Sequence, residues 1–285
     1  MGTALAGRTI VMSGGSRGIG LAILVAAARE GANAVILAKT DSPDPRLPGT
    51  VHTAVSEIEA AGGSSGARAV GVIGDVRVEE DVQRAVDMAV STFGGVDICV
   101  NNASALNLSS TEELPMKRFD LMQQINARGT FLLTKTCVPH LKKSGHGQIL
   151  TLSPPLNLAP KWLGAHPAYM LSKYGMTLLT LGFAAEFAGD GVTANCLWPR
   201  TTIATAAILN LIPDAAEASR APEIMGDAAV VLFKEHSFTG PRRSGETLID
   251  DDVLAAAGVT DLSKYGAGPD FALDLFVDPP GTAAN

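Results

Sequence analysis

The chain has 285 residues, of which 46% are hydrophobic and 18% charged, and its formal net charge is −7 at pH 7. This acidic balance excludes a protein that binds nucleic acid through clustered Lys and Arg. The hydrophobic content is enough for a large core, but no apolar run reaches the length of a membrane span.

The cysteines and the amino-terminal residues indicate the compartment. Cys99, Cys137 and Cys196 are far apart and lie within apolar segments, which predicts buried free thiols in a reducing environment. Residues 1–8 have neither the basic start nor the apolar core of a signal peptide. The five histidines show no metal-ligand spacing. We therefore expect a soluble cytoplasmic protein without a metal site and without a membrane or nucleic-acid partner.

Short apolar runs alternate with long segments of helical periodicity along the whole chain. The expected strands are residues 9–13, 34–38, 69–73, 97–101, 148–153, 192–197 and 246–249, and the expected helices are residues 19–30, 51–61, 79–93, 116–143, 169–188 and 223–235. This alternation predicts one α/β domain over residues 1–285, a doubly wound parallel sheet with helices on both faces. The weakly patterned stretch 204–222 after the sixth strand is a candidate substrate lid.

A glycine-rich turn follows the first strand and opens the first helix. It reads Ser13-Gly14-Gly15-Ser16-Arg17-Gly18-Ile19-Gly20, with glycines in a G-x-x-x-G-x-G order. Glycines let backbone N–H groups approach a pyrophosphate, and the helix N-terminus adds partial positive charge. By itself such a turn is weak evidence for a dinucleotide site, because ordinary strand-to-helix turns are also rich in glycine.

The end of the second strand bears on which dinucleotide is bound. An acidic residue at this end binds the adenosine ribose in NAD-specific sites, but Lys39 stands here instead. Lys39 together with Arg17 could hold a 2′-phosphate, which favours NADP(H). The alternatives are a solvated Lys39 and, because Asp41 is close in sequence, binding of NAD(H).

Polar residues follow the next two strands. The third strand ends in Asp75-Val76, and the fourth ends in Asn101-Asn102-Ala103, where buried amides need hydrogen-bond partners. Asn126 lies within an apolar helical segment, in which Asn has poor propensity. It is either a satisfied interior side chain that bends the helix or a distortion that places a water or a side chain near an active site.

Ser153 follows the fifth strand, and Tyr169 and Lys173 lie four residues apart on one face of the following helix. A neighbouring ammonium and the positive nicotinamide ring of a bound cofactor favour the phenolate and lower a tyrosine pKa from its usual value near 10. Tyr169 could then exchange a proton with a substrate oxygen, with Ser153 donating a hydrogen bond to the same oxygen. The alternative is an ordinary surface pair on a helix.

The order of these features, closed by Asn195-Cys196-Leu197-Trp198-Pro199, resembles the short-chain dehydrogenase/reductase family over nearly the whole chain. Residues 38–40, 152–158, 173–176 and 197–201 resemble its hydroxysteroid dehydrogenase-like branch. The resemblance implies a Rossmann-type sheet of about seven strands. It implies Asn126, Ser153, Tyr169 and Lys173 as the catalytic set. It also implies a cofactor site formed by Ser13, Gly14, Ser16, Arg17, Gly18, Ile19, Gly20, Lys39, Asp75, Val76, Asn102, Ala103, Tyr169, Lys173, Pro199, Thr201 and Thr202.

Three positions depart from the family pattern. Ser13 stands where the family usually has threonine, which keeps a hydroxyl and changes little. Leu156 occupies the position, about 13 residues before the tyrosine, at which the family usually has serine, so Ser153 is displaced. Arg200 replaces a glycine that commonly follows the proline, and we expect it to contact the cofactor phosphates or to favour an anionic substrate.

The expected function is an NAD(P)(H)-dependent oxidoreductase that interconverts a small-molecule alcohol and carbonyl, with an apolar or unknown substrate. One alternative is a non-catalytic dinucleotide-binding member that acts through protein partners. A second is a sugar-nucleotide epimerase or dehydratase, which would need a larger substrate region after Pro199. The helices at 116–143 and 169–188 are apolar on more than one face, which predicts a homodimer or homotetramer unless residues 204–222 cover them.

Overall fold

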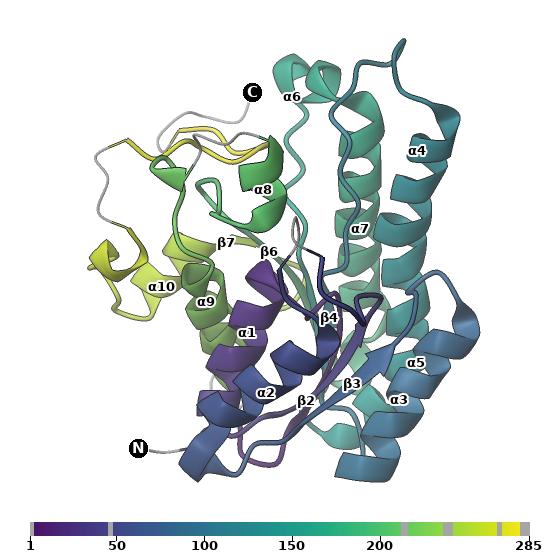
Figure 1. Ribbon diagram of the computed structural model, residues 1–285, viewed down its shortest axis with the longest axis vertical. Helices are drawn as coiled ribbons and strands as arrows, with labels where there is room; N and C mark the ends of the chain where they lie inside the picture. The colour runs from purple at the N-terminus through teal and green to yellow at the C-terminus, as the bar shows by residue number, and fades with distance from the viewer. Residues whose placement is uncertain (1–2, 45–47, 212–215, 236–241, 267–269, 280–285) are drawn as a thin grey trace.

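The computed structural model describes residues 3–44, 48–211, 216–235, 242–266 and 270–279. Within these residues the strands form one parallel sheet in the order β3-β2-β1-β4-β5-β6-β7 (Figure 1). The strands are β1 (Thr9–Ser13), β2 (Asn33–Ala38), β3 (Ala69–Ile73), β4 (Ile98–Asn101), β5 (Gln148–Thr151), β6 (Thr193–Trp198) and β7 (Thr247–Ile249). The doubly wound sheet expected from the sequence is confirmed, with small shifts at the strand ends.

The helices cover both faces of this sheet. They are α1 (Gly18–Arg29), α2 (Val51–Gly62), α3 (Glu79–Phe93), α4 (Met116–Met122), α5 (Gly129–Ser144), α6 (Pro160–Ala165), α7 (Pro167–Glu186), α8 (Ala206–Leu211), α9 (Glu223–Lys234) and α10 (Asp250–Ala256). The segment predicted as one helix over 116–143 is α4, a π-helical turn over Gln123–Arg128 and α5. The sequence pattern missed the short helices α6, α8 and α10.

Two separate apolar cores fill the spaces between the layers. Helices α1, α2, α9 and α10 contribute to one core, with Ile23, Ile58 and Phe233 among its buried side chains. Helices α3, α5 and α7 contribute to the other, which includes Val86 and Phe183. Because apolar side chains cover both faces, most of the strands are buried along their whole length, which explains their continuous apolar sequences.

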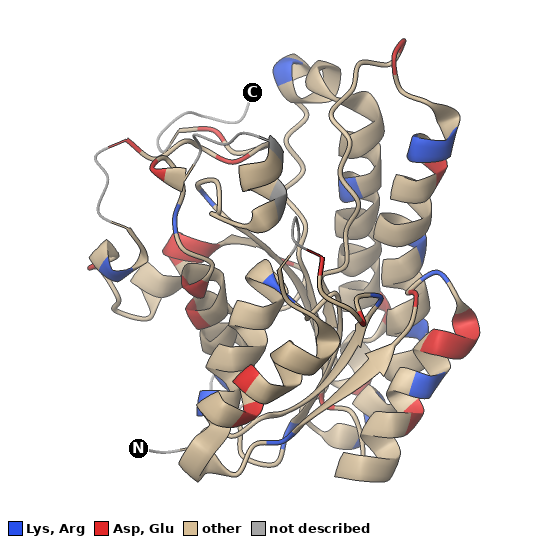
Figure 2. Ribbon diagram, in the orientation of Figure 1, with Lys and Arg blue, Asp and Glu red and all other residues tan. Residues whose placement is uncertain are grey.

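Local signals set the ends of α3. Its first turn contains Glu79, Glu80 and Asp81 and is red in Figure 2. Negative charge is favourable there, because the helix dipole places partial positive charge at the amino-terminal end. The helix ends where Gly94 adopts a left-handed conformation with φ of 92°.

The sheet order reverses between β1 and β4, and the connections at the carboxyl ends of the strands meet at this edge. A segment from the far end of the chain reaches the same edge. Thr202 N donates to Ala272 O, and Asp274 N donates to Arg200 O, each at 2.9 Å. The connection after β6 is therefore paired with residues 272–274, a contact that the sequence pattern did not predict.

The candidate lid 204–222 begins close to the glycine turn. A Cβ added at Gly18 would lie 3.2 Å from Thr205 Cγ2, just before α8. Residues 212–215 of the lid lie outside the described residues. A lid at this place stays a prediction, as does the single domain over residues 1–285.

Candidate active site

The glycine turn between β1 and α1 packs tightly against the chain that follows β4. A Cβ added at Gly14 would lie 2.9 Å from both Ala103 Cα and Asn102 Nδ2, and one at Gly20 would lie 2.6 Å from Asn102 Nδ2. Gly14 also has a φ of 77°, which disfavours any residue with a Cβ. Glycine is therefore required at both positions by close packing against the chain after β4.

Polar contacts hold the two sides of this turn together. Asn102 Nδ2 donates to Gly14 O at 2.8 Å, and Ser13 Oγ accepts from Ala103 N at 3.2 Å. Asn101 instead points toward α5, where its Nδ2 donates to Thr134 Oγ1 at 3.0 Å. Asn102 thus holds the glycine turn against the chain after β4, whereas Asn101 forms its hydrogen bond in the interior between β4 and α5.

Positive side chains flank the end of β2. Arg17 donates to Thr40 Oγ1 at 2.6 Å and to Gly49 O at 2.9 Å. Lys39 Nζ lies 3.1 Å from Asp75 Oδ2 and keeps an exposed side chain. Asp41 is the acidic residue because of which NAD(H) binding remained an alternative. Its Oδ1 lies 2.7 Å from His52 Nε2. Two cations are thus available beside the glycine turn, at the place where the sequence predicts a 2′-phosphate.

Asp75 is the centre of a charge cluster at the end of β3. Arg77 contacts its carboxylate through Nε at 3.0 Å and through Nη2 at 2.6 Å. These hydrogen bonds, more than the neighbouring Lys39, hold the pKa of Asp75 well below its usual range. The next residue, Val76, packs against the start of α5, where a Cβ at Gly129 would lie 3.0 Å from it. Asp75 is therefore held by Arg77, and the next residue, Val76, is held by its packing against α5.

Asn126 lies in the π-helical turn and is fully buried. Its Oδ1 accepts from Ala105 N at 2.7 Å, and its Nδ2 donates to Ala105 O at 3.0 Å and to Ser172 Oγ at 2.9 Å. Both amide hydrogens are used, so the side chain is a satisfied brace between the chain after β4 and helix α7. The predicted distortion of the helix is present, and Asn126 acts through the neighbours that it holds.

Tyr169 and Lys173 lie one turn apart on α7, and both are buried. Lys173 Nζ donates to Leu152 O at 2.6 Å and lies 4.8 Å from the centre of the Trp198 ring. Among the described residues, none makes a hydrogen bond with Tyr169 Oη. The pair is thus brought together at the end of β5, with the phenol left free for a ligand.

Burial governs the protonation of this pair in the protein alone. It lowers the pKa of Lys173 to about 7 and, with a contribution from Asp274, raises the pKa of Tyr169 well above its usual value. The lowered pKa expected from the sequence counted the nicotinamide ring as well as the ammonium, and in the protein alone burial outweighs the ammonium. The charges of bound ligands would have to lower this pKa.

Asp274 is a further titratable group at this site and was missed by the sequence analysis. Its Oδ1 accepts from Leu275 N at 2.7 Å, and burial raises its pKa to about 7 despite the favourable field of Lys173. No motif spacing leads to this residue, because it lies about a hundred positions after the helix that it faces.

Two buried hydroxyls at the strand ends lack a partner. Ser153 Oγ and Thr201 Oγ1 make no hydrogen bond with any described residue. The hydroxyl of Thr202, in contrast, lies 2.8 Å from Ser219 Oγ and 3.2 Å from Ala218 O. Unpaired buried hydroxyls are rare in proteins, and a bound ligand would satisfy them. Leu156, at the usual serine position, is about one third exposed.

Arg200 is already paired within the protein. Its Nε donates to Asp251 Oδ2 at 2.6 Å, its Nη2 lies 2.7 Å from Asp252 Oδ2, and its backbone N donates to Asp250 Oδ1. The expectation that Arg200 contacts cofactor phosphates or an anionic substrate is therefore not supported. The arginine connects the chain after β6 to the start of α10.

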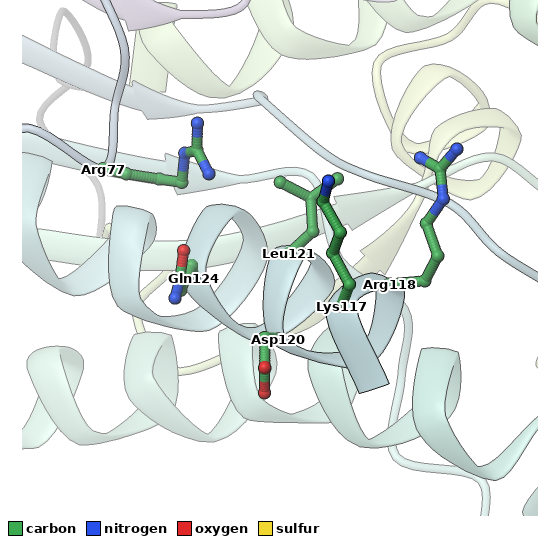
Figure 3. A pocket seen from close by; sticks show the side chains of 6 residues that line it. All are labelled: Arg77, Lys117, Arg118, Asp120, Leu121 and Gln124. Carbon is green, nitrogen blue, oxygen red and sulfur yellow. The ribbon is translucent and has the colours of Figure 1, made fainter. Parts of the chain in front are cut away.

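A hollow of about 540 Å³ lies on α4 and borders the Asp75–Arg77 cluster through Arg77. It is lined by Arg77, Lys117, Arg118, Asp120, Leu121 and Gln124. Figure 3 shows Arg77, Lys117 and Arg118 projecting to one side of the helix, whereas Asp120 points the other way. The glycine turn and α7 do not line it, so the hollow adjoins the site only at Arg77.

The three cysteines lie in β4, α5 and β6. Cys99, Cys137 and Cys196 are buried and free, as predicted. Among the described residues, no group of His, Cys, Asp and Glu side chains is arranged to hold a metal ion.

Comparisons with known proteins agree with the resemblance seen in the sequence. Residues 8–212 match the family model described as short chain dehydrogenase. Hydroxysteroid dehydrogenase-like protein 2 of Danio rerio is 50% identical over 278 residues, which are 96% of this chain and 65% of the relative. The Homo sapiens protein of that name is 47% identical over 278 residues, with 96% and 64% covered. The chain thus spans slightly less than two thirds of these relatives.

Solved structures confirm the fold. A crystal structure from Xanthomonas campestris is 50% identical with a TM-score of 0.90, and 96% of this chain and 99% of that chain are covered. A short chain dehydrogenase from Mycobacterium thermoresistibile is 50% identical with a TM-score of 0.89, and 97% and 98% are covered.

Proposed function

The chain belongs to the short-chain dehydrogenase family, and from this premise we propose that it interconverts an alcohol and a carbonyl with NADP(H) as its preferred cofactor. The observation that supports this most is the position of Tyr169 and Lys173 at the carboxyl edge of the sheet, where Lys173 Nζ donates to Leu152 O and the next residue, Ser153, has an unpaired hydroxyl. The glycine turn stands at the start of α1, where a helix N-terminus favours an anion such as a pyrophosphate.

The proposed chemistry assigns each residue one task. The dinucleotide, when bound, gives or takes the hydride at the substrate carbon. Tyr169 Oη donates a proton to the substrate oxygen in the reduction and accepts it in the oxidation. The ammonium of Lys173 favours the phenolate, whereas an ionised Asp274 disfavours it. Because Asp274 has a pKa of about 7, its protonation near neutral pH removes the unfavourable field.

The residues around this pair position it. Asn126 holds Ala105 and Ser172, so that α7 and the chain after β4 keep their separation. Ser153 donates a hydrogen bond to the substrate oxygen. The hydroxyl of Thr201 forms a hydrogen bond with the nicotinamide carboxamide of the cofactor. Thr202 is bound within the protein and has no such role.

Arg17 and Lys39 support the preference for NADP(H). A 2′-phosphate is a stronger acceptor than a ribose hydroxyl, and both cations stand at the end of β2. The experiment is a fluorescence titration of the protein with NADPH and with NADH, followed by a panel of carbonyls and alcohols. We expect NADPH to bind at least about tenfold more tightly. Equal affinities would contradict the preference, and no reduction of any carbonyl would contradict the reaction.

An assembly of identical subunits is part of the proposal. Phe131 on α5 and Leu171 and Leu178 on α7 are about half exposed. Large apolar side chains gathered on neighbouring helices indicate a protein interface, and a second copy of the chain is the expected partner. Light scattering at micromolar concentration should give a dimer or a tetramer, and a monomer would contradict this.

Among the described residues, no helix has the length and apolar character needed to cross a bilayer. A cytoplasmic location stays a prediction that rests on the reduced, buried cysteines.

A further inference from the structure

Residues 274–278, which we name the clasp, lie against the catalytic helix although the family match ends at residue 212. The clasp lies after α10 in the chain and returns to the carboxyl edge of the sheet through its pairing with the connection after β6. A segment outside the shared family core thus contacts the residues to which the chemistry is assigned.

Phe276 is the centre of this contact and is almost fully buried. Its ring lies in a cluster with four aromatic residues, which come from α6, α7 and β6. The ring centres lie 5.2 Å from Tyr174, 5.9 Å from Trp162, 6.1 Å from Tyr169 and 6.5 Å from Trp198. The Phe276 ring stacks on that of Tyr169 at an interplanar angle of 30°. Phe276 therefore sets one wall beside the candidate proton donor.

The backbone of Phe276 is strained. Its φ is 70°, and among the described residues it is the single non-glycine with a positive φ. Such conformations persist where surrounding contacts force them, and they cluster at active sites and ligand clamps. A phenylalanine that served only to fill a core would not need this conformation.

Hydrogen bonds on both sides of Phe276 impose the strain. Trp198 Nε1 donates to Leu275 O at 3.0 Å, and Trp162 Nε1 donates to Asp278 Oδ1 at 3.1 Å. Asn157 Nδ2 donates to Asp278 Oδ2 at 2.7 Å. Asp278 also forms an ion pair with Lys161, and these contacts lower its pKa. The clasp is therefore fastened to the chain that follows β5.

The surroundings of the cluster are apolar. Leu106, Leu108 and Leu114 from the chain after β4 pack against it, as do Leu163 and Met170. Leu156 and Leu158 are exposed on the chain after β5. A group that reaches Tyr169 from solvent on this side meets carbon surfaces, which favour an apolar substituent.

We propose that Phe276 is a specificity-determining residue, whose ring forms the wall against which the apolar substituent of the substrate carbonyl lies, and that Asp278 positions this ring. The inference rests on the proposed function and names its substrate class: carbonyls and alcohols that carry an apolar chain or ring. The ring limits the length of that substituent, so its removal favours longer substrates.

Binding can be measured here without turnover. NADP⁺ and a ketone form a complex that cannot react, because the cofactor holds no hydride to give. The chain has two tryptophans, Trp162 and Trp198, and both contact the clasp. Their fluorescence therefore reports ligands that reach this wall. The probes are butan-2-one and nonan-2-one, titrated into the NADP⁺-saturated protein.

For wild-type protein we expect saturable binding of both ketones. Phe276→Ala should raise the preference for nonan-2-one over butan-2-one by about tenfold or more, since a few methylenes in an apolar site account for such ratios. Asp278→Ala leaves the Phe276 ring in place but removes the contacts that position it. This variant should shift the nonan-2-one to butan-2-one binding ratio in the same direction by a smaller factor. Phe271→Ala is the matched control, because Phe271 packs under the Arg220 guanidinium at 4.2 Å, outside the cluster. It should leave the ratio unchanged.

A ratio within twofold of wild type in both Phe276→Ala and Asp278→Ala overturns the inference, as does wild-type protein that binds neither ketone. If Phe276→Ala does not fold, as judged by thermal melting, the Asp278→Ala ratio decides alone. The proposed function has a separate test, and it fails if no ketone supports the oxidation of NADPH. The ratio of ketone binding constants decides the role of Phe276 in either case.

Discussion

The glycine turn and the Tyr169–Lys173 pair lie at the same edge of the sheet but are held in place in opposite ways. The turn is defined by missing side chains: at Gly14 and Gly20 there is no room for a Cβ beside Asn102. The pair is defined by what surrounds it, including Trp198, Asp274 and the clasp. The turn depends on one packing partner, the chain after β4, whereas the pair depends on residues from several distant parts of the chain.

This difference affects chemistry as well as shape. A turn that exposes backbone N–H groups needs only the right conformation to bind an anion. The pair needs the right protonation, and burial moves the pKa of Tyr169 and that of Lys173 in opposite directions. Substitutions at the turn should therefore affect binding and folding, and substitutions near the pair should affect rates and pH dependence.

Gly14→Ala should have the largest effect on the turn. The new Cβ would lie 2.9 Å from Ala103 Cα at a φ of 77°. We expect a loss of about 2–5 kcal/mol in the free energy of unfolding and about 100-fold weaker NADPH binding, measured by denaturant unfolding and by fluorescence titration. Gly66→Ala is the control, because its φ is 75° but nothing lies within 4 Å. Equal effects of the two variants would show that backbone strain alone matters.

The strands and helices could be predicted because their apolar periodicity is a local property, and the pair because four residues make one helical turn. The clasp could not be predicted. Nothing in the sequence around Phe276 shows that it meets Trp162 and Tyr169, since that contact depends on a return of the chain after α10. The burial that raises the pKa of Tyr169 was missed for the same reason, because burial is not visible in spacing.

Lys39→Ala tests the cations beside the turn. Loss of one charge-assisted contact to an exposed phosphate should weaken NADPH binding about tenfold and leave NADH binding unchanged. Lys135→Ala is matched, since Lys135 is similarly exposed and pairs with Glu79 at 3.4 Å. If NADPH and NADH weaken equally, Lys39 does not distinguish the 2′-phosphate.

Asp274→Asn tests the burial of the pair through pH. Folding raises the pKa of Asp274 to about 7, so the native state favours its protonated form. That contribution to stability is complete below the unfolded pKa of about 4 and is lost as pH rises to about 7. The stability of wild type relative to Asp274→Asn should therefore fall between these values in denaturant unfolding.

Asp261→Asn should give the opposite pH dependence of the stability difference from wild type. The Asp261 carboxyl is exposed, and hydrogen bonds from Ser263 lower its pKa. Its contribution is lost as pH falls, so the difference from wild type should shrink toward acidic pH. A wild-type advantage over Asp274→Asn that does not change with pH would contradict the buried state of Asp274.

Arg200→Ala should have the smallest effect on ligands. Arg200 is paired with Asp251 and Asp252, so we expect NADPH affinity within twofold of wild type. The free energy of unfolding should fall by about 1–2 kcal/mol, since the pairs are partly exposed. A tenfold loss of NADPH affinity would restore a role for Arg200 in cofactor binding.

The most direct test of the account is the rate of NADPH oxidation by Tyr169→Phe with a ketone that the wild type reduces, measured together with the NADPH dissociation constant. We predict a rate at least about 100-fold lower with the dissociation constant unchanged, because the phenol carries the proton and the glycine turn binds the cofactor. Tyr265→Phe, which loses a remote hydrogen bond to Asp227, should retain the wild-type rate. A Tyr169→Phe rate within threefold of wild type would contradict the account.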